Sequence, residues 1–158
     1  RLRDYYLALG YGNPYRWAQF RDVPFTTLKK PLNECRVGLV TTAAPLKDDA
    51  GDQGARAPYN AAAKFYNVYA GDSSDVGFLG ISHLGYDRKY STAEDTNAYF
   101  PMKALNAAVE RGEIGDVSPR FYGTPTNRSQ VTTLDQDCLD ILNLMIEDKV
   151  DGAVIAAN

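Results

Sequence analysis

The sequence contains one histidine, one tryptophan and two cysteines in 158 residues. Two cysteines, Cys35 and Cys138, are too few for the disulfide framework of a small secreted domain. A single histidine leaves a structural zinc site short of nitrogen and sulfur ligands. Neither Gly-x4-Gly-Lys-Ser/Thr nor Gly-x-Gly-x-x-Gly occurs, so nucleotide binding has little support. We therefore expect no metal site and no bound cofactor within this chain.

Long apolar runs and clusters of basic residues are also missing. No run approaches the ~20 apolar residues of a membrane span, and residues 1–6 are too polar for a signal peptide. The formal net charge is -3 and lysine and arginine do not cluster, which argues against a nucleic-acid partner. These absences predict a cytoplasmic protein that contacts neither nucleic acid nor membrane.

The composition is otherwise that of an ordinary globular protein, with 44% hydrophobic and 23% charged residues. A chain of this length can build one hydrophobic core. Tyrosine is frequent, with 11 residues. Two interpretations remain open for these side chains, which suit half-buried positions as well as a large subunit interface.

The N-terminal part differs from the rest of the chain. Residues 3–9 predict a short helix that Gly10 ends. Residues 15–25 are rich in aromatic side chains but show no regular periodicity, so they cannot bury these side chains by themselves. We predict a helix and an aromatic arm over residues 1–34, which pack on the main domain or on another subunit, and an α/β domain over residues 35–158.

The order of elements after residue 35 predicts the fold. Short β-branched apolar runs predict strands, and Pro101 with Gly112 brackets a helix. Residues 60–69 suit a helix or a strand equally well. The predicted strands are residues 36–42, 76–84, 120–123 and 153–157, the last of them buried. This order favours a three-layer α/β fold, with a mostly parallel sheet and helices on both faces.

The last helix carries the clearest sequence signals. Thr133 and Gln136 have the spacing of a capping box, which predicts that the helix starts there. An apolar stripe follows, and it predicts the face that packs on the core. Its members are Leu134, Cys138, Ile141, Leu142 and Met145. Cys138 is accordingly predicted to be buried in the core. The sequence leaves the role of Cys35 undecided.

Ligands of open α/β sheets bind outside the carboxyl ends of the strands. Four residues follow or end predicted strands in this way, namely Thr41, Thr42, His83 and Asn158. His83 suits a proton carrier or a metal ligand because imidazole titrates near neutrality, and it equally suits a hydrogen-bonded structural role.

Several segments resemble the glycine/sarcosine/betaine reductase selenoprotein B family, which also includes D-proline reductase components and short stand-alone members. The matching segments are residues 36–43, 51–53, 82–87, 94–97, 99–101, 112–115, 126–130 and 151–154. Glu94-Asp95-Thr96-Asn97 with Tyr99-Phe100-Pro101, followed by Gly112-Glu113-Ile114-Gly115, is the most specific part. In this family a redox cysteine or selenocysteine follows the last strand, and this sequence ends before it.

Three explanations for the end at Asn158 remain open: a truncated chain, a split gene and proteolytic processing. Related reductase proproteins are cleaved before a cysteine, which becomes a pyruvoyl group on the downstream chain. The resemblance therefore implies a partner polypeptide that brings either a redox cysteine or a pyruvoyl carbonyl, which captures amines as Schiff bases.

The strand-end positions and the resemblance together give the candidate residues. His83, Asp87 and Asn158 form the expected catalytic set, with His83 and Asp87 handling protons. The expected substrate-binding residues are Thr41, Thr42, Asp52, Gln53, Asn97 and Arg128. Arg128 would hold an anionic group. Solvated loops and helix caps are the alternative roles for Asp87 and Asn97, and a surface position is the alternative for Arg128.

The resulting hypothesis is a subunit or N-terminal fragment of an oligomeric reductase that acts on a small amine or amino-acid derivative. Reductive C–N cleavage is implied by the resemblance. The alternative is a non-catalytic structural or binding subunit that uses the aromatic arm as a partner surface. A hydrolase lacks a serine or cysteine nucleophile motif beside the single histidine.

Overall fold

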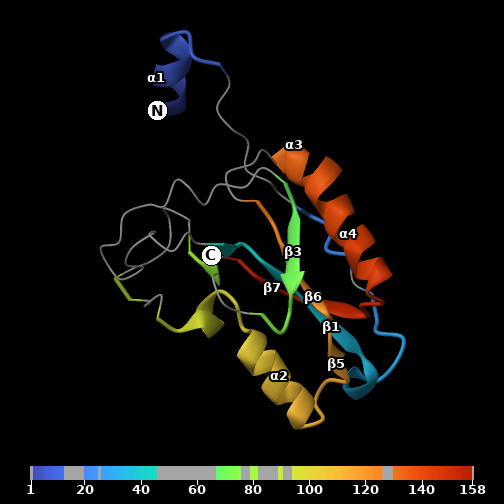
Figure 1. The fold of residues 1–158 in the computed structure, drawn as a ribbon. Coiled ribbons are helices and arrows are strands. Elements are labelled where there is room, and N and C mark those ends of the chain that lie inside the picture. The colour runs from blue at the N-terminus through green and yellow to red at the C-terminus, as the bar shows by residue number, and fades with distance from the viewer. Residues whose placement is uncertain are drawn as a thin grey trace.

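A computed structural model describes residues 2–12, 20–24, 26–45, 67–75, 79–81, 89–90, 94–125 and 130–157. The elements lie around one mostly parallel sheet, with helices on both sides of it (Figure 1). The helices are α1 (Leu2–Ala8), α2 (Met102–Glu110), α3 (Gln130–Thr132) and α4 (Cys138–Glu147), with short 3-10 turns at Leu32–Glu34 and Thr96–Ala98. The strands are β1 (Arg36–Thr41), β2 (Ala44–Pro45), β3 (Tyr69–Asp72), β4 (Leu79–Gly80), β5 (Asp116–Val117), β6 (Arg120–Gly123) and β7 (Gly152–Ala156).

β1 is the central strand of the sheet. Five of its six residues are buried, as expected for an apolar β-branched strand that is covered on both faces. β7 pairs with it in parallel along its length, from Val37–Gly152 to Thr41–Ala156. The predicted strand over residues 36–42 is therefore confirmed.

β5 and β6 lie together on the other side of β1. Val37 pairs with Val117 of β5, and Val40 pairs with Tyr122 of β6, both in parallel. The register shifts by two residues between these pairs, because Ser118 and Pro119 are inserted between the two short strands. The predicted strand over residues 120–123 matches β6.

β3 is an antiparallel strand that pairs with β6 on the side away from β1. The sequence left Tyr69 open between helix and strand, and its run into Gly71 and Asp72 did not predict a strand. β3 packs tightly: a Cβ atom on Gly71 would lie 2.5 Å from the Phe121 ring. The residue type is thus set by the close approach of a side chain from the neighbouring strand.

α2 covers one face of the sheet and forms the main core. Met102 is 1% exposed and packs in one cluster with Leu39 of β1 and Phe121 of β6. The rings of Phe100 and Phe121 meet edge to face, with their centroids 4.8 Å apart. Burial of each such side chain contributes about 1.5–3 kcal/mol. The helix starts after Pro101 and ends shortly before Gly112, which has a positive φ, as the sequence predicts.

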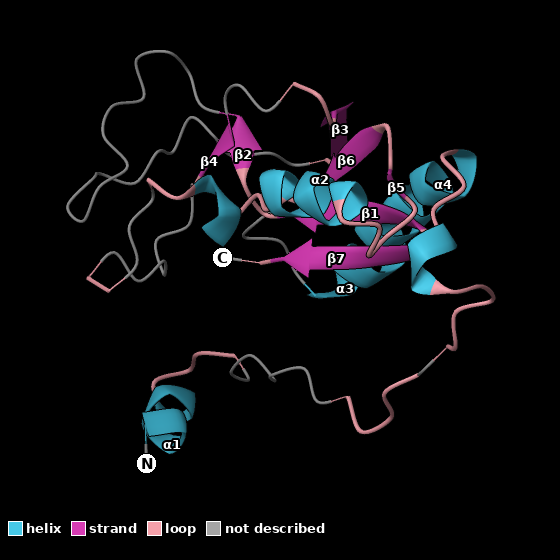
Figure 2. Ribbon diagram, turned by 90° about the horizontal axis from the view of Figure 1, so that it is seen from below, coloured by secondary structure: helices cyan, strands magenta, loops and turns pink. Residues whose placement is uncertain are grey.

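α4 lies on the opposite face. Tyr122 follows Phe121 in β6, so its side chain points to the other face, where its hydroxyl donates to Asp148 at the end of α4. Helices on both faces confirm the α/β fold (Figure 2). Glycine is required beneath this helix, because a Cβ atom on Gly38 would lie 3.1 Å from the Tyr122 ring and 3.2 Å from Val150.

The predicted start and buried face of this last helix are wrong. The helical segment begins at Gln130, and Thr133 lies inside a π-helical turn, Thr133–Asp137, instead of at an N-terminal cap. Leu134 lies within this π turn, which changes its position around the helix relative to the residues of α4. Within α4, Ile141 and Met145 are half-buried. Cys138 is exposed, and Leu134 and Leu142 are 46% and 50% exposed.

Two predicted strands also differ from the structure. β7 forms the edge of the sheet among the described residues, and its Ile155 is 72% exposed instead of buried. Of the predicted strand over residues 76–84, the structure describes β4, which pairs antiparallel with β2 in a separate ribbon. The apolar pattern indicated extended backbone but not which strand would lie beside it.

α1 contributes no buried residue. The aromatic residues of the predicted arm that are described are exposed, such as Phe20 at 66%. Tyr15, Trp17 and Phe25 lie outside the described residues, so the proposed division at residues 34 and 35 stays a prediction. No helix within the described ranges is long and apolar enough to cross a membrane.

Candidate functional site

Thr41 links the end of the central strand to the turn that precedes α2. Its side chain is 0% exposed, and its hydroxyl donates to the Tyr99 carbonyl oxygen over 2.7 Å. The Thr41 Oγ1 atom in turn accepts from the Ala43 backbone N–H over 3.0 Å. One hydroxyl therefore fixes both the turn after β1 and the segment that leads into α2.

A small pocket lies beside this link, with a volume of about 140 Å³. Its lining comes from β4, from the Thr96–Ala98 turn and from the start of α2. The lining residues are Leu79, Thr96, Tyr99, Phe100, Met102 and Lys103. Sites for drug-sized ligands occupy about 300–1,000 Å³, so this pocket suits a molecule of only a few heavy atoms.

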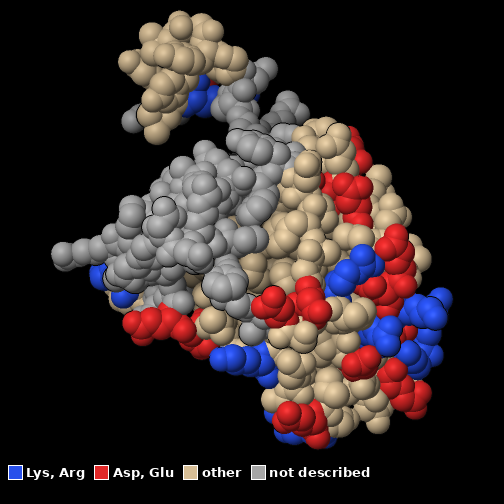
Figure 3. All heavy atoms as spheres, in the orientation of Figure 1, with Lys and Arg blue, Asp and Glu red and all other residues tan. Residues whose placement is uncertain are grey.

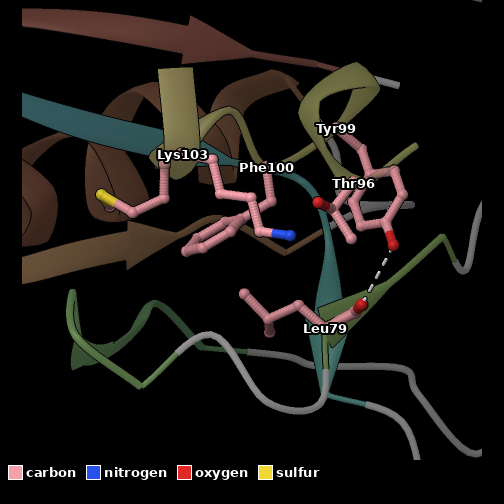
Figure 4. Close-up of a pocket in the computed structure, with 6 residues that line it drawn as sticks. Leu79, Thr96, Tyr99, Phe100 and Lys103 are labelled. Atoms are coloured by element: carbon pink, nitrogen blue, oxygen red, sulfur yellow. Dashed lines mark hydrogen bonds between the residues drawn. The ribbon is translucent and has the colours of Figure 1, made fainter. Parts of the chain in front are cut away.

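The polar groups of the pocket stand at one side of an apolar wall. The Tyr99 hydroxyl donates to the Leu79 carbonyl oxygen over 3.3 Å, which ties the β4 ribbon to the turn (Figure 4). The Lys103 side chain extends past Phe100 toward Thr96 in the same view. An ammonium group beside a hydroxyl can hold a carboxylate, while the apolar wall excludes water around the rest of a small ligand.

Tyr69 secures the strand end from the other direction. Its hydroxyl donates to the Ala43 carbonyl oxygen in a short hydrogen bond. Burial raises the pKa of this phenol, which therefore remains a protonated donor at neutral pH. The ring lies so close to Gly123 that a Cβ atom there would collide with it. The turn over residues 41–44 is thus held by two side chains from different elements.

The structure describes three of the nine predicted site residues. Thr41 is buried within the framework of the pocket. Thr42 is half-buried, and its N–H donates to the Ala156 carbonyl oxygen over 3.2 Å. Asn97 is exposed, and both its backbone and side-chain N–H groups donate to the Asp95 carboxylate, at 2.9 and 3.1 Å. The chain thus brings Thr41 and Asn97 to one region, because Tyr99 accepts from Thr41 two residues after Asn97.

The other six predicted site residues lie outside the described residues. They are Asp52, Gln53, His83, Asp87, Arg128 and Asn158. Their roles stay predictions. Sequence reasoning did not find Lys103 or Tyr99 as pocket residues. The available signal was Pro101, because a helix that starts at this edge of the sheet places its first turn beside any ligand bound there.

A second polar cluster lies at the amino end of β6 and is structural. Arg120 binds the Asp148 carboxylate at 2.8 Å and Glu147 at 3.0 Å. The Tyr122 hydroxyl also donates to Asp148, over 2.7 Å, and contacts Ser118 Oγ at 2.8 Å. Burial raises the pKa of Tyr122 to about 12, and hydrogen bonds from Arg120 lower the pKa of Asp148. This cluster fixes the end of α4 to the sheet.

The described residues include no cluster of side chains suited to bind a metal ion. The described ranges contain no group of three or more histidine, cysteine, aspartate or glutamate side chains that could hold an ion. The two thiols differ in exposure: Cys138 is exposed and Cys35 is buried, with its Sγ 3.3 Å from the Pro31 carbonyl oxygen.

The structure thus combines an α/β fold with a small pocket at the carboxyl edge of the sheet. The family model for glycine/sarcosine/betaine reductase selenoprotein B matches residues 10–158, nearly the whole chain. The chain therefore belongs to this family of reductase components. Comparisons with curated proteins and with solved structures return no match.

Proposed function

We propose that this chain forms part of an enzyme that reductively cleaves the C–N bond of a small amine or amino-acid derivative. The family match over residues 10–158 carries this proposal. In such a reaction R–CH2–NH3⁺ takes up two electrons and two protons and gives R–CH3 and NH4⁺. A dithiol can supply both electrons and protons as it becomes a disulfide.

The described thiols do not form such a pair, because Cys35 is buried and Cys138 is exposed on α4. The reducing group must therefore come from another polypeptide segment. A redox cysteine or a pyruvoyl carbonyl on a downstream fragment or partner subunit would fill this role, and a pyruvoyl group would also capture the amine. The family's place among reductase components supports a partner subunit.

The pocket beside Thr41 would bind the carboxylate end of the substrate. Lys103 supplies a positive charge and Thr96 a hydroxyl, and the wall of Leu79 and Phe100 limits the size of the ligand. His83 and Asp87 are proposed to transfer protons, and Arg128 to bind a second anionic group. Asp52, Gln53, Thr42 and Asn97 remain proposed substrate contacts, and Asn158 is proposed to take part in catalysis.

Substrate binding can be tested on this chain directly by NMR titration with glycine, sarcosine and betaine. We expect the largest chemical-shift changes at the backbone amides of Thr96 and Lys103. Methylamine, which lacks the carboxylate, should cause none. Lys103→Gln should weaken binding by about 10-fold, since a charge-assisted hydrogen bond is lost, whereas Lys103→Arg should retain it.

Lys29→Gln removes an exposed lysine outside the pocket and is the matched control. Equal affinity of the wild type and Lys103→Gln would remove the pocket from the proposal. The reaction itself requires the complete reductase, with dithiothreitol as electron donor and ammonia, methylamine or trimethylamine as the measured product. Absence of amine release from all three substrates would contradict the proposed chemistry.

A further inference from the structure

α4 carries a second apolar stripe that points away from the sheet. Leu139, Leu142 and Ile146 are 54%, 50% and 64% exposed. Their spacing of three and then four residues places them along one line of the helix, the spacing of a helix–helix seam. Large exposed apolar groups in a contiguous line mark interaction sites more often than isolated ones do.

The position of this stripe follows from the contacts of Arg120. Both Glu147 and Asp148 bind Arg120 of β6, so that side of α4 faces β6. Successive residues turn by about 100° around a helix, which puts Leu142 about 140° from Glu147. The stripe therefore lies on the side of α4 that is turned away from Arg120.

β7 carries a further exposed apolar side chain on the face of the sheet that α4 covers. Ile155 of β7 pairs with Val40 of β1. The Leu39 side chain points toward α2, so the side chain of the next residue, Val40, points to the opposite face of the sheet. Because side chains alternate along a strand, Ile155 points to the face that α4 covers, where it is 72% exposed. We call Leu139, Leu142, Ile146 and Ile155 the α4–β7 surface.

The backbone edge of β7 is equally open. Among the described strands, β7 pairs with β1 alone, and residues 152–156 contain no charge and no proline. Proteins usually protect an edge strand with charged side chains, proline or a bulge, because an unprotected edge pairs with another strand. This edge therefore has the character of a strand that meets a partner.

The charges at the two ends of the stripe indicate which partner fits. Asp135 precedes the stripe and Lys149 follows it; both are exposed, and neither forms an ion pair in the described part of the chain. Two copies of α4 that run antiparallel, centred between Leu142 and Asn143, set Leu139 opposite Ile146. The same arrangement brings Asp135 of each copy to within about one residue of Lys149 of the other, about 1.5 Å along the helix axis.

The remaining acidic side chains of α4 do not oppose this arrangement. Asp140 and Glu147 lie on the side of the helix away from Leu142, as helical geometry requires. Figure 3 shows acidic residues along α4 with uncharged surface between them, and mixed charges near its C-terminal end. The surface is thus complementary to itself, which is the requirement for a two-fold interface between identical chains.

We infer that a second copy of this chain packs on the α4–β7 surface about a two-fold axis, with the two α4 helices antiparallel. The apolar side chains form the centre of the interface and the two Asp135–Lys149 pairs form its ends. The same axis runs the β7 strands of the two copies in opposite directions. This inference does not depend on the proposed reaction.

Sedimentation velocity over about 1–100 µM protein tests the inference, because a dimer's population depends on concentration. The wild type should sediment as a dimer at the upper end of this range. Leu142→Glu should sediment as a monomer, and its thermal unfolding measured at low concentration should match that of the wild type, since the side chain is half-exposed.

Charge reversal identifies the partner as a second copy. Asp135→Lys and Lys149→Glu should each weaken the dimer by about 10-fold, because each places like charges opposite one another. The double variant should recover the wild-type affinity. An equal mixture of the two single variants should form a mixed dimer, in which all facing charges are opposite in sign.

Asp140→Lys is the matched control, since it changes the same charge on α4 away from the stripe. It should leave the dissociation constant unchanged. A wild-type chain that remains monomeric throughout the range would overturn the inference. Single variants that dimerise as well as the wild type, or a double variant that does not recover, would overturn it too.

Discussion

Asp148 shows how much of this fold depends on one carboxylate. Three side chains contact Asp148, namely Arg120 and Tyr122 of β6 and Ser118 of the link between β5 and β6. The carboxylate is 10% exposed, so water replaces these contacts poorly. Loss of its charge would leave the Arg120 guanidinium without its main partner and the Tyr122 hydroxyl with a weaker acceptor.

The pH dependence of stability should report this cluster. The folded-state pKa of Asp148 lies below its ordinary value, so its contribution is present above the unfolded-state pKa of about 3.9 and is lost as the pH falls through the folded-state pKa. Urea unfolding between about pH 6 and pH 2 should show a smaller decrease for Asp148→Asn than for the wild type. Identical slopes for the two proteins would contradict this.

The same cluster acts with the opposite sign in alkaline solution. Burial raises the pKa of Tyr122 to about 12. In the unfolded chain this phenol ionises near pH 10, below its pKa in the folded protein. Its contribution to the free energy of unfolding is therefore fully present below about pH 10 and is lost as the pH rises through the folded-state pKa. One pair of side chains therefore limits the stable range at both ends.

At the scale of elements, α2 and α4 end in the same way but with different residues. Gly112 donates to Val109 and Lys149 donates to Ile146, and in each helix the next N–H reaches one residue further back. This is the Schellman motif, which needs a left-handed residue. Gly112 has φ 70° and Lys149 has φ 57°. Only glycine adopts this conformation without strain.

Exchanging the residue type at these two ends should have opposite effects. Gly112→Ala should lower the free energy of unfolding by about 1 kcal/mol, because a Cβ atom is strained at positive φ. Lys149→Gly should raise it by about 0.5–1 kcal/mol for the same reason. Urea unfolding at low protein concentration measures both without a contribution from self-association. Changes of the same sign would contradict the shared geometry.

The sequence predicted the elements whose signals are local. β1 and β6 are apolar runs, and Pro101 and Gly112 mark α2 by their backbone restrictions. β3 was not predicted, because Gly71 and Asp72 are poor strand residues and the strand is set by packing against Phe121. The face of α4 was wrong at Cys138 and Leu142. Neighbours such as Ile141 and Leu142 point about 100° apart on a helix, and their spacing did not indicate which of them faces the sheet.

The same distinction applies to the site. Thr41 was predicted from the rule that ligands bind where parallel strands end, and the structure places it in the frame of a pocket. Lys103 and Tyr99 were not predicted, because their approach to Leu79 depends on the separate β2–β4 ribbon. Pairing of that ribbon joins residues far apart in the chain, and no spacing in the sequence records it.

At the scale of the whole molecule, the core and the N-terminal helix are independent. Among the residues that the structure describes, the buried ones fall between Cys35 and Asp137, whereas every residue of α1 is exposed. In Figure 1 α1 stands apart from the sheet. The stability of the α/β domain should therefore come from residues 35–158 together with contacts such as the Lys30–Asp151 ion pair at 2.7 Å.

Removal of residues 1–12 should leave the melting temperature of the domain within about 2 °C of the full chain, since no buried surface is lost. Circular dichroism and differential scanning calorimetry measure this. Removal of residues 1–34 is the comparison: it also removes Lys30 and the Pro31 carbonyl that contacts Cys35, and should lower the melting temperature. Equal melting temperatures for the two truncations would contradict this division.

The hydroxyl of Thr41 serves two backbone groups at once, the Tyr99 carbonyl and the Ala43 amide. The Ala43 amide proton can therefore resist exchange with solvent only while the segment before α2 is docked on the strand end. A single proton thus reports the opening and closing of the pocket wall, and its exchange rate follows that motion even when the rest of the sheet stays closed.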